Sequence, residues 1–188
     1  MTKNTILVSS LLSTMGLYLF VMFLGDFAEP VKYWANLSAH LAFYYFLITF
    51  AVGPANKIFN DTFTLKLLRH RRYFGLGFAV THSFHLLALT YFFVVTNESP
   101  EMLSIVGGGL GYVVMYMMAL TSNSQMIKKL GSKRWKMLHS SGMHYFAFIF
   151  LVTFTLRFIE ESFSAIYGIY VLLLVSVYTA RIYILKQL

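Results

Sequence analysis

Residues 68–96 have the sequence LRHRRYFGLGFAVTHSFHLLALTYFFVVT. A cluster of arginines opens this stretch, and an apolar run over 73–96 follows it, with His82 and His85 inside the run. A helix rises about 1.5 Å per residue, so a run of this length crosses the roughly 30 Å hydrocarbon core of a bilayer. Basic residues mark the cytoplasmic end of such helices. The stretch therefore predicts a transmembrane helix that enters from the cytoplasm and carries two histidines into the membrane.

The composition of the whole chain agrees with a membrane protein. Apolar residues make up 58% of the 188 residues and charged residues only 12%, whereas a quarter of an ordinary globular domain is charged. The mean hydropathy is +0.67. There is no cysteine, which excludes disulfides, thiolate metal sites and iron–sulfur clusters. Most of the cations behind the net charge of +8 lie on one side of the expected membrane, so we expect membrane lipid rather than nucleic acid as the partner.

Six apolar runs follow one another along the chain. They cover approximately residues 5–25, 33–53, 73–96, 102–122, 135–158 and 163–185. Each is long enough to span the hydrocarbon as a helix. We therefore predict an all-α integral membrane protein, a bundle of six transmembrane helices that forms a single domain over residues 1–188.

Charge predicts the orientation of this bundle. The linkers 53–73 and 122–136 are basic, and an even number of crossings places both chain ends on the same side as these linkers. The opposite side carries most of the acidic residues and only two cations, Lys32 and Arg157. The acidic residues there are Asp26, Glu29, Glu98, Glu101, Glu160 and Glu161. Lys3, Arg181 and Lys186 lie near the two termini. Both termini should therefore be cytoplasmic.

Histidines within the apolar runs point to a bound cofactor. An ionisable side chain inside a bilayer is costly unless it is paired or ligated, so it marks a functional site by default. Four of the six histidines lie in or at the mouth of two runs: His82, His85, His139 and His144. Histidine pairs on facing helices commonly hold haem iron. A simpler explanation is a hydrogen bond from each imidazole to a neighbouring helix.

Depth in the membrane limits which histidines can share one ligand. Counted from the inner helix ends, His82 and His144 lie at roughly 13 Å, His85 at roughly 18 Å and His40 at roughly 20 Å, while His139 lies at roughly 6 Å. Depth therefore allows either His82 or His85 to share a level with His144 near mid-membrane, whereas His139 lies lower. Our first choice for the axial pair is His85 and His144. His82 and His139 are the alternates, and His40 is a further residue of the site.

Other polar features have less specific explanations. Arg71, Arg72 and Arg134 fit the positive-inside rule and contact with anionic headgroups, and they could also hold haem propionates or a flavin phosphate. The glycine-rich run 107–111 follows no expected strand, so we interpret it as close helix packing rather than a phosphate loop. The apolar runs contain no set of catalytic side chains, so any reaction would belong to a cofactor.

Two motifs resemble the ferric-reductase-like transmembrane family. The first is LRHRRYFGL at 68–76 with His85 nine residues further on, and the second is LTS at 120–122 followed by KLGSKRWKMLH at 129–139. The resemblance covers roughly residues 35–150. It is strongest to the haem-binding membrane subunit of the bacterial methionine sulfoxide reductase system.

This resemblance implies a six-helix b-type cytochrome of the bacterial inner membrane. Its motifs match His85 and His139 as ligands, and Arg71 and Arg72 as a basic pair associated with flavin, so it favours His139 where depth favours His144. The larger relatives hold two haems with histidines 13 or 14 apart on each of two helices. Here the positions 13 away are Val152 from His139, Arg157 from His144 and Arg72 from His85. We therefore expect one haem b rather than two, with FMN or a quinone as a further candidate.

The expected function is electron transfer across the membrane. Electrons would come from a cytoplasmic flavin reductase or a quinol and leave to a soluble, periplasmic acceptor. The chain would be an oxidoreductase subunit without its own flavin or nicotinamide domain. The alternative is a non-redox membrane protein, either a metal or ion carrier or a scaffold for a partner.

Overall fold

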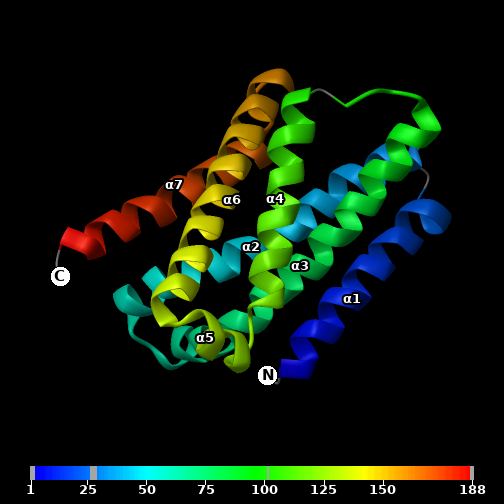
Figure 1. Cartoon of the computed structure of the whole chain (residues 1–188). Coiled ribbons are helices and arrows are strands. Elements are labelled where there is room, and N and C mark those ends of the chain that lie inside the picture. The colour runs from blue at the N-terminus through cyan, green and yellow to red at the C-terminus, as the bar shows by residue number, and fades with distance from the viewer. Residues whose placement is uncertain (1–2, 26–28, 101, 187–188) are drawn as a thin grey trace. The chain divides into compact units, whose positions relative to one another are not determined.

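All regular structure in the described part of the chain is helical. The structure is a computed structural model, and it describes residues 3–25, 29–100 and 102–186. The predicted charges Asp26 and Glu101 lie outside these residues. The helices are α1 (Lys3–Leu19) with its π-helical continuation η1 (Phe20–Leu24), α2 (Pro30–Phe59), α3 (Thr62–Thr96), α4 (Met102–Leu120), α5 (Ser124–Leu130), α6 (Ser132–Glu160) and α7 (Ala165–Lys186), shown in Figure 1. The predicted all-α class is confirmed.

Five of these helices are by themselves long and apolar enough to cross a membrane. They are α1 with η1, α2, α3, α6 and α7. The sixth apolar helix, α4, is shorter and is followed after a short break by α5, and the two helices meet at an angle of 105°. Counted as one broken span, they bring the total to six. A multi-pass membrane protein is thus supported, whereas six complete crossings and cytoplasmic termini stay predictions.

Helices α2 and α3 extend well beyond the apolar runs that predicted them. The linker expected over 53–73 is helical except for a short break at Asn60 and Asp61, and α2 continues through Pro54. Asn60 has a positive φ of 45°, which turns the chain there. The Asp61 carboxylate then caps α3 by accepting the backbone N–H of Thr64 at 2.6 Å. This hydrogen bond lowers the pKa of Asp61 below its ordinary value.

The chain divides into two compact units. Unit 1 comprises Met1–Thr49 and Arg69–Gly109, and unit 2 comprises Phe50–Leu68 and Leu110–Leu188. Helices α2, α3 and α4 therefore each contribute a part to both units. A single domain over residues 1–188 stays a prediction.

The core of unit 1 joins α1, α2 and α3. Val21 of η1, Trp34 and Ala35 of α2 and Ala88 of α3 form one buried cluster. Trp34 packs edge-to-face against Tyr18 of α1, with 4.9 Å between ring centroids. Such aromatic pairs add to the burial of apolar area. The cluster holds α2 and α3 together, and these two helices carry the histidines of the unit.

In unit 2, α6 packs closely against both α4 and α7. Gly142 of α6 is buried, and a β-carbon there would collide with Met118 of α4 and come within 3.0 Å of Val114. Phe154 of α6 packs against Tyr170 of α7 with 4.9 Å between ring centroids. The approach of α4 to α6 therefore depends on a glycine of α6.

The glycine-rich run of α4 contributes less to packing than we predicted. A β-carbon at Gly108 or Gly109 would meet no atom of the described chain within 4 Å, whereas one at Gly111 would touch Phe146 at 3.4 Å. Close packing is therefore confirmed at Gly111 and wrong for Gly108 and Gly109. A helix needs a small residue only where its surface meets a neighbour, and no residue of the described chain lies within 4 Å of a β-carbon at these two positions.

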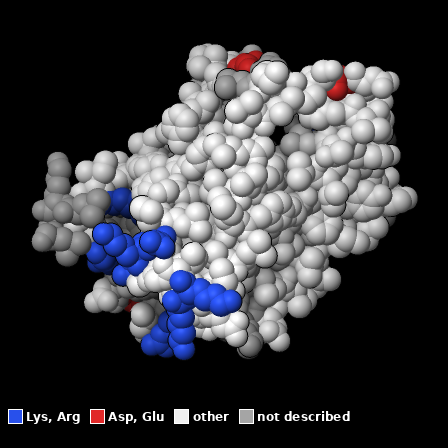
Figure 2. Space-filling view, viewed as in Figure 1, with Lys and Arg blue, Asp and Glu red and all other residues white. Residues whose placement is uncertain are grey.

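Charge in unit 2 is divided between the two ends of α6. Figure 2 shows lysine and arginine side chains gathered where α5 and the start of α6 lie in Figure 1. The exposed cations of this region are Lys128, Lys129, Lys133, Arg134 and Lys136, and exposed Glu160 and Glu161 stand at the far end of α6. The cations at the start of α6 are consistent with the positive-inside rule, which concerns lysine and arginine alone.

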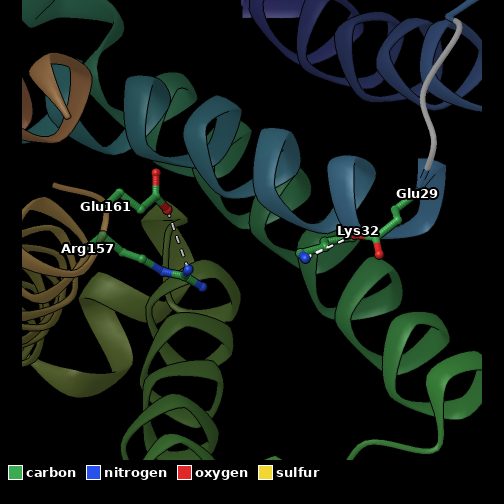
Figure 3. Close-up of polar contacts among 4 residues, drawn as sticks. All are labelled: Glu29, Lys32, Arg157 and Glu161. Carbon is green, nitrogen blue, oxygen red and sulfur yellow. Dashed lines mark ion pairs between the residues drawn. The ribbon is translucent and has the colours of Figure 1, made fainter.

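The two cations expected on the acidic side are each paired within their own unit. Lys32 lies 3.0 Å from Glu29 in unit 1, and Arg157 lies 3.5 Å from Glu161 in unit 2 (Figure 3). All four side chains are exposed to solvent, between 43% and 62% of their surface, so these pairs contribute little stability. The two carboxylates do neutralise Lys32 and Arg157, the two cations expected on the acidic side of the membrane.

Candidate functional site

His85 is held at one ring nitrogen by helix α2. Its Nδ1 lies 3.1 Å from the carbonyl oxygen of Ala35 and 3.0 Å from the hydroxyl oxygen of Ser38. Ser38 is fully buried, with 1% of its surface exposed, and its hydroxyl donates to the same Ala35 carbonyl at 2.8 Å. The imidazole is therefore fixed between a carbonyl and a hydroxyl from α2, which sits against α3 in the core of unit 1.

These contacts assign the tautomer of His85. A carbonyl oxygen only accepts hydrogen bonds, and the Ser38 hydrogen already goes to Ala35, so both contacts require a proton on Nδ1. The lone pair of the neutral imidazole is then on Nε2. Histidines that ligate metals usually donate their other N–H to a backbone carbonyl or a carboxylate in this way, which orients the ring and raises its basicity. The surroundings of His85 therefore fit an iron ligand that binds through Nε2.

Two more predicted histidines lie in unit 1 near His85. The ring of His82 stacks on Phe78 at 5.1 Å, and its centroid lies 5.4 Å from that of His85. His40 is half-buried on α2 and close enough to His85 to interact with it electrostatically. His82 and His85 are three residues apart on α3, and their neighbouring rings lie on the same face of that helix.

His144 lies in unit 2, on α6, with an exposed side chain. Its Nδ1 is 3.4 Å from the hydroxyl oxygen of Tyr178 on α7, and that hydroxyl donates to the His144 carbonyl oxygen, also at 3.4 Å. At 3.4 Å both contacts are long, and the phenol hydrogen can turn toward either the carbonyl oxygen or Nδ1, so these contacts do not fix the tautomer of His144. The exposed imidazole of His144 is thus less firmly oriented than that of His85.

His139 has different surroundings in the same unit. The Thr121 hydroxyl donates to the Met117 carbonyl at 2.7 Å, so it accepts from His139 Nε2 at 3.1 Å. Trp135 stacks on the imidazole at 4.2 Å and donates its indole N–H to the Thr121 carbonyl at 3.0 Å. The neutral imidazole then carries its lone pair on Nδ1. His139 thus helps to join the end of α4 to the start of α6, and Nε2 is its hydrogen-bond donor.

The three predicted arginines differ in their contacts. Arg71 is half-buried in unit 1, and its Nε donates to the Thr49 carbonyl of α2 at 2.9 Å. Arg72 is exposed, with its guanidinium 5.7 Å from the ring of Tyr73. Arg134 is exposed on the first turn of α6 in unit 2. Arg71 therefore has a structural contact in place, whereas Arg72 and Arg134 present their charge to the surroundings.

Four residues around these histidines were not predicted from the sequence: Ala35, Ser38 and Tyr178, which contact them, and Arg181, whose charge acts on His144. Each of them lies far along the chain from the residue it contacts. Arg181 had been assigned only to orientation, and Ser38 is an ordinary serine in an apolar run. Within the described residues, no group of three or more His, Asp or Glu side chains is arranged to hold a metal ion.

Comparison with known proteins identifies relatives of the chain. It is 26% identical over 140 residues, 73% of its length, to the protein-methionine-sulfoxide reductase haem-binding subunit MsrQ of Herminiimonas arsenicoxydans. The MsrQ of Rhodospirillum rubrum is 25% identical over 119 residues, 61% of the chain. The chain is homologous to MsrQ. This confirms the resemblance to the haem-binding subunit that the two motifs predicted.

The similarity has defined limits. The match spans 64% of the Herminiimonas MsrQ and 57% of the Rhodospirillum MsrQ, so the chain covers less than two thirds of either relative. The magnetosome protein MamZ of Paramagnetospirillum magneticum is 29% identical over 124 residues, which is 62% of this chain and 19% of MamZ. No family model and no solved structure matches the chain.

Proposed function

We propose that this chain is a haem-binding electron-transfer subunit embedded in the bacterial inner membrane. The homology to two MsrQ proteins, which are named as haem-binding subunits, supports this function. The five or six apolar helices agree with a multi-pass membrane protein. When bound, haem supplies a ferric–ferrous couple that accepts and releases one electron at a time.

One observation of the structure carries the proposal. The buried contacts of Ala35 and Ser38 with His85 hold the imidazole with its lone pair on Nε2. The tautomer and the neighbouring carbonyl are those of a ligand histidine.

The proposed axial ligands are His85 and His144. His82 and His139 remain the alternates, and His40 is a nearby residue of the site. The choice of His144 rests on the depth expected from the sequence and on its exposed imidazole, while the motif resemblance favours His139. We propose a single haem b, with Arg72 and Arg134 as cations that could bind propionates or a flavin phosphate.

The proposed direction of electron flow is outward. A cytoplasmic flavin reductase, with FMN bound near the Arg71–Arg72 pair, or a membrane quinol would supply the electrons. A soluble acceptor in the periplasm would receive them. The basic ends of α5 and α6 would then face the donor, because cations mark the cytoplasmic side.

The absorption spectrum of the purified protein tests this function. We expect a sharp Soret band that shifts on reduction, with one haem per chain by pyridine haemochrome assay. His85→Ala should abolish the low-spin spectrum. His70→Ala is the matched control, since this histidine lies among arginines near the start of α3 and should leave the spectrum unchanged.

Other outcomes would redirect the assignment. Full retention of the low-spin spectrum in His85→Ala would move the ligand role to His82. A colourless protein from haem-replete cells would overturn the proposal. Metal analysis would then distinguish a metal carrier, which would contain zinc or another metal without porphyrin, from a metal-free scaffold.

A further inference from the structure

Pro54 lies inside α2 and alters one hydrogen bond of that helix. Proline has no backbone N–H, so the carbonyl of Phe50, four residues earlier, cannot accept the usual helical bond from residue 54. The guanidinium of Arg181 supplies a donor instead: its Nη2 lies 2.7 Å from the Phe50 carbonyl oxygen, across 131 residues of sequence. Helix α7 is thereby joined to α2 at the proline.

The same guanidinium also stacks on the Phe50 side chain. The central carbon of the Arg181 guanidinium lies 4.2 Å from the centroid of the phenyl ring. Phe50 is completely buried, with 0% of its surface exposed, and Arg181 is half-buried. A desolvated cation over an aromatic face is more strongly held than an exposed one. Arg181 is therefore fixed by both the backbone and the side chain of one residue.

Phe50 connects Arg181 to His144. The phenyl ring lies 5.8 Å from the imidazole, at an interplanar angle of 90°. Tyr178 lies three residues before Arg181 on the same face of α7, and its ring is 5.4 Å from Phe50 and 5.7 Å from His144. Its hydroxyl contacts both the Nδ1 and the carbonyl oxygen of His144.

We propose that Arg181 is a positioning residue for His144, and that it places a fixed positive charge beside the cofactor that His144 ligates. By holding α7 against α2, it keeps Phe50 and Tyr178 in contact with the imidazole. Its charge is close enough to act on His144 electrostatically. The inference rests on the proposed haem function and adds to it a residue that sets the potential of the iron.

The sign of the effect follows from electrostatics. Reduction of ferric iron adds one negative charge, so a nearby cation stabilises the ferrous state and raises the midpoint potential. Neutralising Arg181 should therefore lower the potential. Arg181→Gln should favour the ferric state about tenfold, which is about 59 mV for a one-electron couple. Arg181→Lys keeps the charge and should stay close to the wild-type potential.

Redox titration of the haem-loaded protein in detergent provides the test. Arg157→Gln is the matched control, because it removes the same charge from α6 thirteen residues beyond His144, roughly 20 Å along the helix. It should leave the midpoint potential unchanged. Tyr178→Phe, which keeps the ring but removes the hydroxyl, should change the low-spin electron paramagnetic resonance signal of the bound haem.

A thermal-unfolding cycle tests the link to Pro54 without any cofactor. Pro54→Ala restores a backbone N–H that can donate to the Phe50 carbonyl, so this carbonyl no longer depends on the Arg181 guanidinium for a hydrogen bond. The loss of melting temperature caused by Arg181→Gln should be smaller in the Pro54→Ala background than in the wild type. Equal losses in both backgrounds would overturn the positioning role.

The remaining outcomes separate the two proposals. An unchanged potential in Arg181→Gln with full haem content would overturn the electrostatic role and leave the haem function intact. If Arg181→Gln does not fold, an unaltered resonance signal in Tyr178→Phe overturns the inference. A wild-type protein that binds no haem would refute the proposed function itself.

Discussion

Ser38 contributes a single hydroxyl to the surroundings of His85, yet it shares in fixing the proton on Nδ1. In Ser38→Ala the Ala35 carbonyl still accepts that proton, but the ring loses its second contact. Loss of such a partner typically costs 10- to 100-fold in metal affinity. We expect haem affinity near the lower end of this range, about tenfold weaker, measured by haem titration of the apoprotein.

Ser10 provides a matched control for this substitution. It is also fully buried, with 0% of its surface exposed, and its hydroxyl donates to the carbonyl three residues earlier, as that of Ser38 does. The two serines differ in the imidazole contact. Equal losses of haem affinity in Ser10→Ala and Ser38→Ala would show that the Ser38 effect is structural rather than specific to His85.

At the scale of elements, the contact between α4 and α6 depends on Gly142. A β-carbon there would collide with Met118, and Val114 is also within 3.0 Å. Gly142→Val should therefore destabilise the protein by about 1–3 kcal/mol through overpacking. Gly109→Ala, where the added methyl meets no described atom within 4 Å, should be neutral or stabilise by up to about 1 kcal/mol through helix propensity. Thermal unfolding in detergent measures both variants, and a fully stable Gly142→Val would contradict the packing.

At the scale of the whole molecule, orientation in the membrane is the main prediction. The chain has no cysteine, so single-cysteine variants can be labelled without background. A cysteine in place of Lys129, on α5, should react with a membrane-impermeant maleimide only after the membrane is opened. A cysteine in place of Glu98, after α3, should react in intact spheroplasts. The reverse pattern would invert the predicted topology.

The positions and expected directions of the helices could be predicted from local properties of the sequence. Hydropathy sums over about 20 residues and locates the helices, and the placement of lysine and arginine predicts their direction. The ends of the helices were predicted less accurately: α2 was expected to end near residue 53, but it continues through Pro54 and ends at Phe59. Proline weakens a helix locally, but the Phe50 carbonyl it releases is satisfied by Arg181, which no local pattern in the sequence reveals.

The sequence by itself determined that this protein is helical, apolar enough for a membrane, and rich in histidines placed where a cofactor could bind. Only the tertiary structure decided which ring nitrogen of His85 and of His139 carries the proton. Ala35 and Ser38 direct the lone pair of His85 to Nε2, whereas Thr121 makes Nε2 of His139 a donor. These assignments depend on hydrogen bonds between residues 18 to 50 positions apart, and a hydrogen bond requires proximity in space rather than in sequence.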